Sequence, residues 1–243
     1  MDSPANPPGP PRTIGELRET SLHAALKALL AQPGDLIETP VEGYVVDIAR
    51  GSQLFEIQTG RFSGLKPKLA ALLPGHQVRL VYPVAQSRWV VRAAADGTVL
   101  RRRKSPVRGV AEQVFRELVS IPKLALHPHF SLEVLLIEEE QIWRDDGRGS
   151  WRRQRWSIAD RRLLRVIDQL PLDAAGDYQA LLPPGLPEAF TTAELAEGLG
   201  QPRRLAGQMV YCLREMGLVK AHGKRGRAVL YRQSDPTRTQ HRC

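Results

Sequence analysis

Two short apolar runs separated by a three-residue breaker constrain the fold of this chain more than any other feature. Tyr44–Ala49 and Gln53–Gln58 are rich in β-branched and aromatic residues, and Arg-Gly-Ser at 50–52 stands between them. Runs of this length on either side of a glycine-containing breaker are typical of two antiparallel strands. The sequence therefore predicts a β-hairpin over residues 44–58.

Two carboxylates interrupt the apolar pattern of this hairpin. Asp47 follows two valines in the first run, and Glu56 lies between Phe55 and Ile57 in the second. Apolar strands seldom bury carboxylates unless a partner compensates the charge, and hard divalent cations bind carboxylate oxygens. Alternation along a strand also places Gln58 on the same face as Glu56. We therefore expect a divalent cation between the two carboxylates.

A helix is predicted immediately upstream of the hairpin. Thr13-x-x-Glu16 has the spacing of a capping box, and leucines at helical spacing continue the pattern to about Ala31. At 100° per residue, Glu19 falls inside the leucine stripe and not opposite it. His23, one turn later, is interpreted as an ordinary half-buried histidine, with assistance to a metal site as the alternative.

The elements predicted downstream complete a recognisable order. A short helix is expected over 64–73, and strands are expected over 77–82 and 88–92. Helix, strands, helix, strand, with an Asp, a hairpin and a Glu-x-polar triplet, resembles the PD-(D/E)XK nuclease superfamily. The resemblance implies an α/β fold, with a restriction-endonuclease-like αβββαβ core over residues 12–97.

The resemblance also implies a site and a chemistry. Glu19, Asp47 and Glu56 would surround Mg²⁺ or Mn²⁺, with the Ile57 carbonyl as a further ligand, and the ion would serve phosphodiester hydrolysis. One position departs from the pattern, because Gln58 stands where the superfamily usually has lysine. Gln58 would orient the attacking water, and Lys68 from the next helix would supply the positive charge. The alternative is a hairpin whose two carboxylates only pair with arginines.

Length and charge limit the class of partner. The chain has 243 residues and a formal net charge of +9, which favours a polyanionic partner such as DNA. No apolar run approaches the length of a membrane helix and no secretory leader is apparent, so we expect a cytoplasmic protein without a membrane partner. Two cysteines, Cys212 and Cys243, are too few for a disulfide framework or a zinc ribbon. A homodimer is left open.

The middle of the chain is predicted to connect two domains. Residues 1–11 are proline-rich and are expected to form a disordered tail, whereas 98–156 form a central linker and α+β segment. The basic run over 99–109 either lies along a phosphate backbone or is a solvated connector. A helix is expected over 110–120 and a strand over 131–137.

The last third, residues 157–243, predicts a DNA-binding domain. Ser157-x-x-Asp160 predicts a helix to about Leu170, and Thr191 or Thr192 begins another that ends at Gly200. Pro202 begins a third, which buries Cys212, and a two-stranded ribbon with a basic tip follows. Two helices followed by such a ribbon resemble the winged helix-turn-helix family. The resemblance implies DNA contacts from Gln201, Arg203, Arg204, Gln208, Lys224, Arg225 and Arg227.

Together these patterns predict a metal-dependent DNA endonuclease that is targeted to DNA by its winged helix. The alternative is a non-catalytic DNA-binding regulator that keeps a degenerate nuclease-like domain as a scaffold. Gln58 in place of lysine favours the regulator, whereas the carboxylates retained in apolar strands favour the enzyme.

Overall fold

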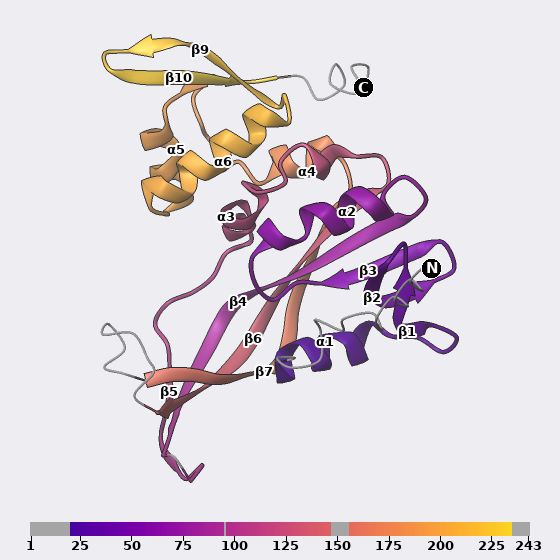
Figure 1. Cartoon of the computed structure of the whole chain (residues 1–243). Helices are drawn as coiled ribbons and strands as arrows, with labels where there is room; N and C mark the ends of the chain where they lie inside the picture. The colour runs from indigo at the N-terminus through magenta and orange to yellow at the C-terminus, as the bar shows by residue number, and fades with distance from the viewer. Residues whose placement is uncertain (1–19, 95, 147–155, 235–243) are drawn as a thin grey trace, which may run out of the picture.

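Two long parallel strands form the centre of the molecule. The computed structural model describes residues 20–94, 96–146 and 156–234 (Figure 1). β4 (Gln77–Ala93) and β6 (Phe130–Asp145) lie side by side, and each carries a nearly continuous apolar run in its first half. Such runs suit strands that are covered on both faces, as parallel strands usually are. β7 (Trp156–Leu172) pairs antiparallel with β6 along nearly its whole length.

The remaining strands extend this sheet on the other side of β4. The strand order is β1-β2-β3-β4-β6-β7, and β5 pairs with the second half of β4. The β3–β4 and β4–β6 pairs are parallel and the others are antiparallel. The hairpin predicted over residues 44–58 is confirmed, with Ile48 opposite Phe55. The bounds of these strands are β1 Leu36–Val41, β2 Tyr44–Arg50, β3 Gln53–Ile57 and β5 Val99–Lys104.

Helices cover both faces of the sheet. On one face, α1 (Ser21–Leu30) packs Leu22 and Leu26 against Ile57 and Val81. Leu80, the neighbour of Val81 on β4, belongs to a second and larger core, because successive strand residues point to opposite faces. The helical segments that build this larger core are η1 Phe62–Gly64, α2 Lys66–Leu72, η2 Ala111–Val114, α3 Phe115–Leu118, η3 Leu124–Leu126 and α4 Ala175–Ala180.

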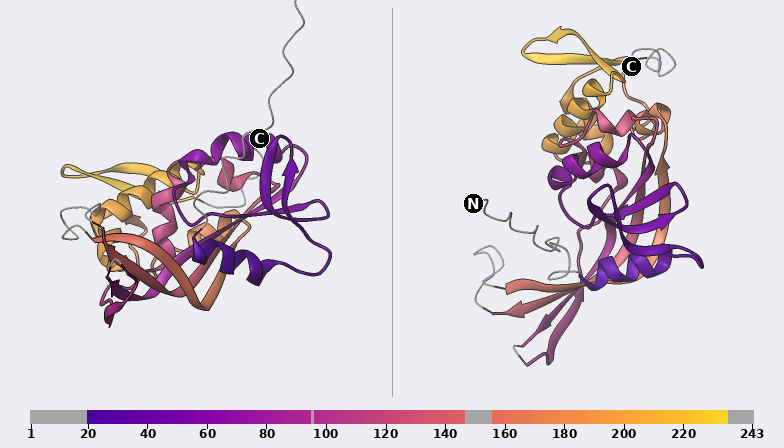
Figure 2. Two further views of the ribbon diagram at one scale, coloured as in Figure 1. Left: turned by 60° about the horizontal axis from the view of Figure 1, so that its bottom comes forward. Right: turned by 45° about the vertical axis from the view of Figure 1, so that its right-hand side comes forward.

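The C-terminal elements form a smaller unit on the same core. α5 (Thr192–Leu199) and α6 (Arg203–Glu215) precede the hairpin of β9 (Val219–Arg225) and β10 (Ala228–Gln233), and β8 (Ala189–Phe190) adds a third strand. Figure 2 shows this unit stacked above the helices that cover the large sheet. The predicted helices and ribbon are confirmed as local structure, and so is the burial of Cys212.

The helix predicted from Ser157 to Leu170 is wrong, because this segment is the strand β7. The apparent cap residues act over a long range instead: the Ser157 hydroxyl donates to Asp146, and Asp160 accepts from Ser21. The strands expected over 77–82 and 88–92 are one continuous strand, β4. One sheet therefore runs through all three expected regions, 12–97, 98–156 and the start of 157–243.

Two further expectations need correction at their boundaries. α1 begins at Ser21 and not at Thr13, because Thr20 is extended and its hydroxyl accepts from the His23 N–H. The expected capping box and Glu19 lie outside the described residues, as do the expected tail over 1–11 and Cys243. The helix expected over 110–120 is a 3₁₀ turn followed by the single turn of α3.

Within the described ranges, no helix combines the length and the apolar character needed to cross a membrane.

Candidate functional site

The β2–β3 ladder ends next to the two carboxylates, Asp47 and Glu56. The last paired residues are Ile48 and Phe55, and beyond them the side chain of Asp47 replaces the backbone pairing. Its Oδ2 accepts the Ile57 N–H at 2.7 Å, which satisfies a donor that the ladder leaves unpaired. Asp47 is thus fixed at the point where the strands separate, and its side chain is only 16% exposed.

Lys68 reaches Glu56 from α2. Its ammonium forms an ion pair with Glu56 Oε2 and donates to the Val45 carbonyl at 2.6 Å. Both side chains are largely buried. The sequence predicted that the lysine missing at position 58 comes from this helix, and the structure brings Lys68 to the carboxylate.

Glu56 carries a buried charge that the protein compensates only in part. Burial raises the pKa of Glu56 to about 7, and the nearby charge of Asp47 acts in the same direction against the opposing effect of Lys68. Burial also acts to raise the pKa of Asp47, but the hydrogen bonds from His23 and the Ile57 N–H outweigh it and hold the pKa below its usual value. The two neighbouring carboxylates therefore differ in how readily they ionise.

His23 is the residue that the sequence undervalued. Its Nε2 lies 3.3 Å from Asp47 Oδ2, so α1 contributes a side chain directly to the carboxylate pair. The only signal in the sequence was its position at the start of a helix that faces the hairpin. Asp160 of β7 accepts from the backbone and hydroxyl of Ser21, which ties the start of this helix to the sheet.

Gln58 does not reach the carboxylate pair. Its backbone N–H continues the parallel pairing by donating to Val81, and its side-chain amide donates to the Arg61 carbonyl at 2.7 Å. The amide thereby holds the loop that leads from β3 into α2.

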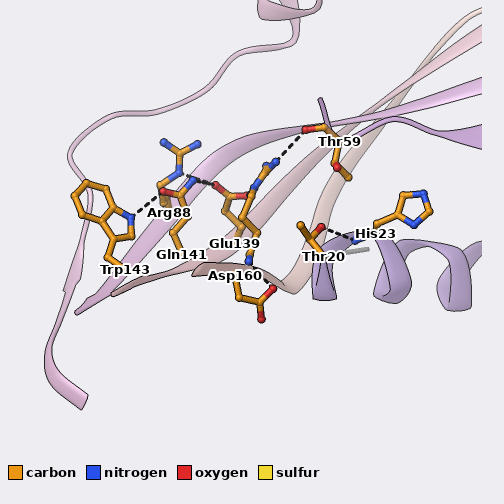
Figure 3. A network of polar contacts seen from close by, with 9 residues as sticks. Thr20, His23, Thr59, Arg88, Glu139, Gln141, Trp143 and Asp160 are labelled. Carbon is orange, nitrogen blue, oxygen red and sulfur yellow. Dashed lines mark hydrogen bonds and ion pairs between the residues drawn. The ribbon is translucent and has the colours of Figure 1, made fainter. Parts of the chain in front are cut away.

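A second buried carboxylate nearby is fully compensated. Glu139 on β6 is completely buried, and its Oε1 accepts from Arg88 at 2.6 Å and from Gln141 at 2.9 Å. Arg161 binds Oε2 through two nitrogens and donates from its third to the Thr59 carbonyl at 3.1 Å. Figure 3 shows Glu139 with Arg88, Gln141 and Thr59 around it. This network is structural, because two arginines already neutralise the charge.

Asp47 and Glu56 offer carboxylate oxygens, the ligand type that hard divalent cations prefer. Two carboxylates that repel one another, one of them with a raised pKa, are stabilised by a cation that takes oxygen ligands. Among residues 20–94, 96–146 and 156–234, no group of three or more histidine, cysteine or acidic side chains gathers closely enough to bind a metal. A third acidic ligand would have to come from elsewhere, and Glu19 lies outside these ranges.

The residues expected to contact DNA divide into two groups. Arg204 and Gln208 line a cleft together with Arg61 and Arg116. The others lie on α6, on the β9–β10 hairpin or, in the case of the half-buried Gln201, in the turn before α6. Among them Arg225 is already engaged, since it pairs with Glu194 of α5 at 2.6 Å. The residues of this second group are Gln201, Arg203, Lys224, Arg225 and Arg227.

The fold and the acid–lysine cluster define a mixed α/β protein whose site lies at the end of a strand ladder. The chain belongs to the family described as "Domain of unknown function (DUF8091)", whose model matches residues 20–173. That span contains the whole large sheet, from α1 to the end of β7. An "Uncharacterized protein" of Treponema pallidum (strain Nichols) is 36% identical over 226 residues, which cover 92% of this chain and 89% of the relative. No solved structure matches the chain.

Proposed function

We propose that this protein is a metal-dependent nuclease that hydrolyses phosphodiester bonds in DNA. The observation that carries the proposal is the convergence of Asp47, Glu56 and Lys68 from three separate elements, β2, β3 and α2. The order α1-β1-β2-β3-α2-β4 supports it, because it is the αβββαβ order implied by the resemblance to the PD-(D/E)XK nucleases.

Each side chain has a role in this proposal. Asp47 and Glu56 would hold Mg²⁺, and the bound ion would supply an activated water and stabilise negative charge on the phosphate. Lys68 orients that water and faces the developing charge, since the Gln58 amide is committed to the Arg61 carbonyl. His23 keeps Asp47 oriented and favours its ionised form. Glu19 remains the proposed third acidic ligand, and the Ile57 carbonyl a further one.

Lys68 and Lys66 provide a matched test of this function. Both lie on α2, but Lys66 is exposed and Lys68 is buried against Glu56. Lys68→Met should lower Mg²⁺-dependent cleavage of plasmid DNA by roughly two to three orders of magnitude, the effect of losing one charge-stabilising donor. Lys66→Met should leave the rate unchanged. The measurement is the rate of nicking or linearisation in Mg²⁺, with EDTA as the blank.

The outcome that contradicts the proposal is equally clear. Wild-type protein that binds DNA but leaves both plasmid and branched DNA intact in Mg²⁺ and in Mn²⁺ is not a nuclease. That result would favour the second candidate function, a non-catalytic DNA-binding protein, which the glutamine at position 58 supports.

We further propose that α5, α6 and the β9–β10 hairpin act as a winged helix-turn-helix domain on duplex DNA. Two consecutive helices followed by a hairpin are the arrangement that this family uses, with the second helix in the major groove. Arg203 is exposed on α6, and Lys224 and Arg227 are exposed at the tip of the hairpin. Exposed cations in these positions are suited to phosphate contacts.

The tip of the hairpin can be tested by salt dependence. Replacing Lys224 and Arg227 by alanine should flatten the plot of log affinity against log salt by about two units, one for each lost phosphate contact. Arg225→Ala should change the slope less than either replacement alone, because Arg225 is paired with Glu194. Fluorescence anisotropy with a labelled duplex measures both. An unchanged slope in the double variant would leave the hairpin without a role in DNA binding.

A further inference from the structure

A basic cleft lies where the loop after β3, α3 and α6 meet. Its volume is about 630 Å³. In Figure 1, α3 lies next to α6 and close to the start of α2, so residues distant in sequence face one another here. Apart from one carboxylate, Glu117, the polar side chains that line the cleft are Arg61, Ser63, Arg116, Ser120, Arg204 and Gln208.

The charge of this cleft is positive. Three arginines, from the β3–α2 loop, α3 and α6, line it against a single carboxylate, Glu117. Arg61, Arg116 and Arg204 are all exposed at the surface, so their guanidinium groups are accessible to a ligand. Arginine presents its donors in a planar fork that matches the oxygens of phosphate.

The first turn of α6 adds to this positive character. Pro202 and Leu205 also line the cleft, and Pro202 is the N-cap of the helix. Proline has no capping side chain, so no side chain at the cap accepts from the amide groups of Arg203 and Arg204. The Leu205 N–H, by contrast, donates to the Pro202 carbonyl. The positive end of the helix macrodipole lies at the same place.

We infer that this cleft binds the phosphodiester backbone of duplex DNA and leads it towards Asp47 and Glu56, an inference that rests on the proposed function. An open cleft lined by exposed arginines and hydroxyl groups suits a polymer backbone. Sites for small ligands are mostly apolar and bury most of the ligand. This cleft is open and is lined mainly by charged and polar side chains. Phosphate contacts of this kind position a duplex without reading its sequence.

The cleft and the carboxylate pair are joined by one short loop. Arg61 follows Glu56 by five residues, and the Gln58 amide holds the Arg61 carbonyl. Even a fully extended chain of five residues spans no more than about 17 Å. That distance corresponds to about five base-pair steps of about 3.4 Å each along the axis of the duplex. A backbone held by Arg61 therefore passes within a few nucleotides of the candidate site.

The test measures binding alone, on the full-length protein in EDTA, with a fluorescein-labelled 20-base-pair duplex. Replacing Arg61 and Arg116 together by glutamine should lower the affinity roughly tenfold per contact at 0.1 M salt and reduce the salt slope by up to two units. The matched control replaces Arg162 and Arg165 of β7 by glutamine, which makes the same change in charge outside the cleft. Both control side chains are exposed and already paired with Asp160 and Glu138.

A variant that should raise DNA affinity distinguishes phosphate binding in the cleft from damage to the fold. Glu117→Gln removes the one carboxylate that opposes phosphate, so it should raise the affinity severalfold, whereas damage to the fold would lower it. Equal losses in the Arg61/Arg116 variant and in the control, or no binding by the wild type even at low salt, would overturn the inference. Because EDTA prevents cleavage, absence of nuclease activity leaves this result standing. If the protein cleaves DNA but its DNA affinity does not depend on Arg61 and Arg116, the proposed function stands and the inference about the cleft is wrong.

Discussion

Replacing Asp47 by asparagine is expected to lower Mg²⁺-dependent DNA cleavage by at least about three orders of magnitude, because a metal ion contributes several kcal/mol of charge stabilisation. The fold should survive, since the asparagine side-chain oxygen can still accept the Ile57 N–H that Asp47 now accepts at 2.7 Å. Glu56→Gln should have an effect of the same order. The rate of plasmid cleavage and the thermal midpoint of each variant measure the two effects separately.

Glu42→Gln supplies the control for this experiment. Glu42 lies in the turn between β1 and β2, is 58% exposed and makes only a 3.7 Å contact with His76. Its replacement should change neither the cleavage rate nor the DNA affinity. DNA affinity should also be retained in the Asp47 and Glu56 variants, because both replacements remove negative charge. Full activity in either site variant would remove the nuclease assignment.

The largest expected loss of stability comes from Glu139→Ala. The change leaves Arg88 and Arg161 without the buried carboxylate that they share, and removing one partner of a buried ion pair typically costs about 3–5 kcal/mol. Both arginines keep some contact with solvent, so the lower end of that range is expected. Urea titration measures the change in the free energy of unfolding.

Glu140→Ala is the matched variant on the same strand. Glu140 is 14% exposed and pairs with Arg102, which is 47% exposed, so this pair is closer to the solvent-exposed pairs that contribute about 0–1 kcal/mol than the Glu139 network is. The two neighbouring alanine variants should therefore differ by about 2 kcal/mol or more. Equal losses would show that the Glu139 network does not contribute more than an ordinary surface pair.

Local signals in the sequence predicted the elements that local contacts determine. The hairpin over 44–58 follows from two apolar runs around a glycine, and the helix beginning at Thr192 follows from its capping box with Glu194. The position of Lys68 near the carboxylates could also be predicted from the sequence, because the prediction required only that α2 lie beside the hairpin. In each case the partners are few residues apart or on adjacent elements.

Long-range strand pairing and packing determine the structure of the segments that were predicted wrongly from the sequence. Leu163, Leu164 and Ile167 fit helical spacing, but β6 offers this segment a partner strand along nearly its whole length. The importance of His23 depends on how α1 docks on the sheet, which Leu22 and Leu26 determine through residues more than thirty positions away. The basic run over 99–104 is an edge strand, because the second half of β4 leaves it a free edge.

The way in which Asp47 ends the β2–β3 ladder has a consequence for how this family can diverge. The backbone needs only an acceptor for the Ile57 N–H, which asparagine supplies as well as aspartate does. Alanine would leave that amide unpaired at a cost of about 1–3 kcal/mol. Asparagine at this position would therefore preserve the architecture whether or not the proposed hydrolysis takes place. Under the proposed function, the negative charge of aspartate at this position is what selection on the reaction would retain.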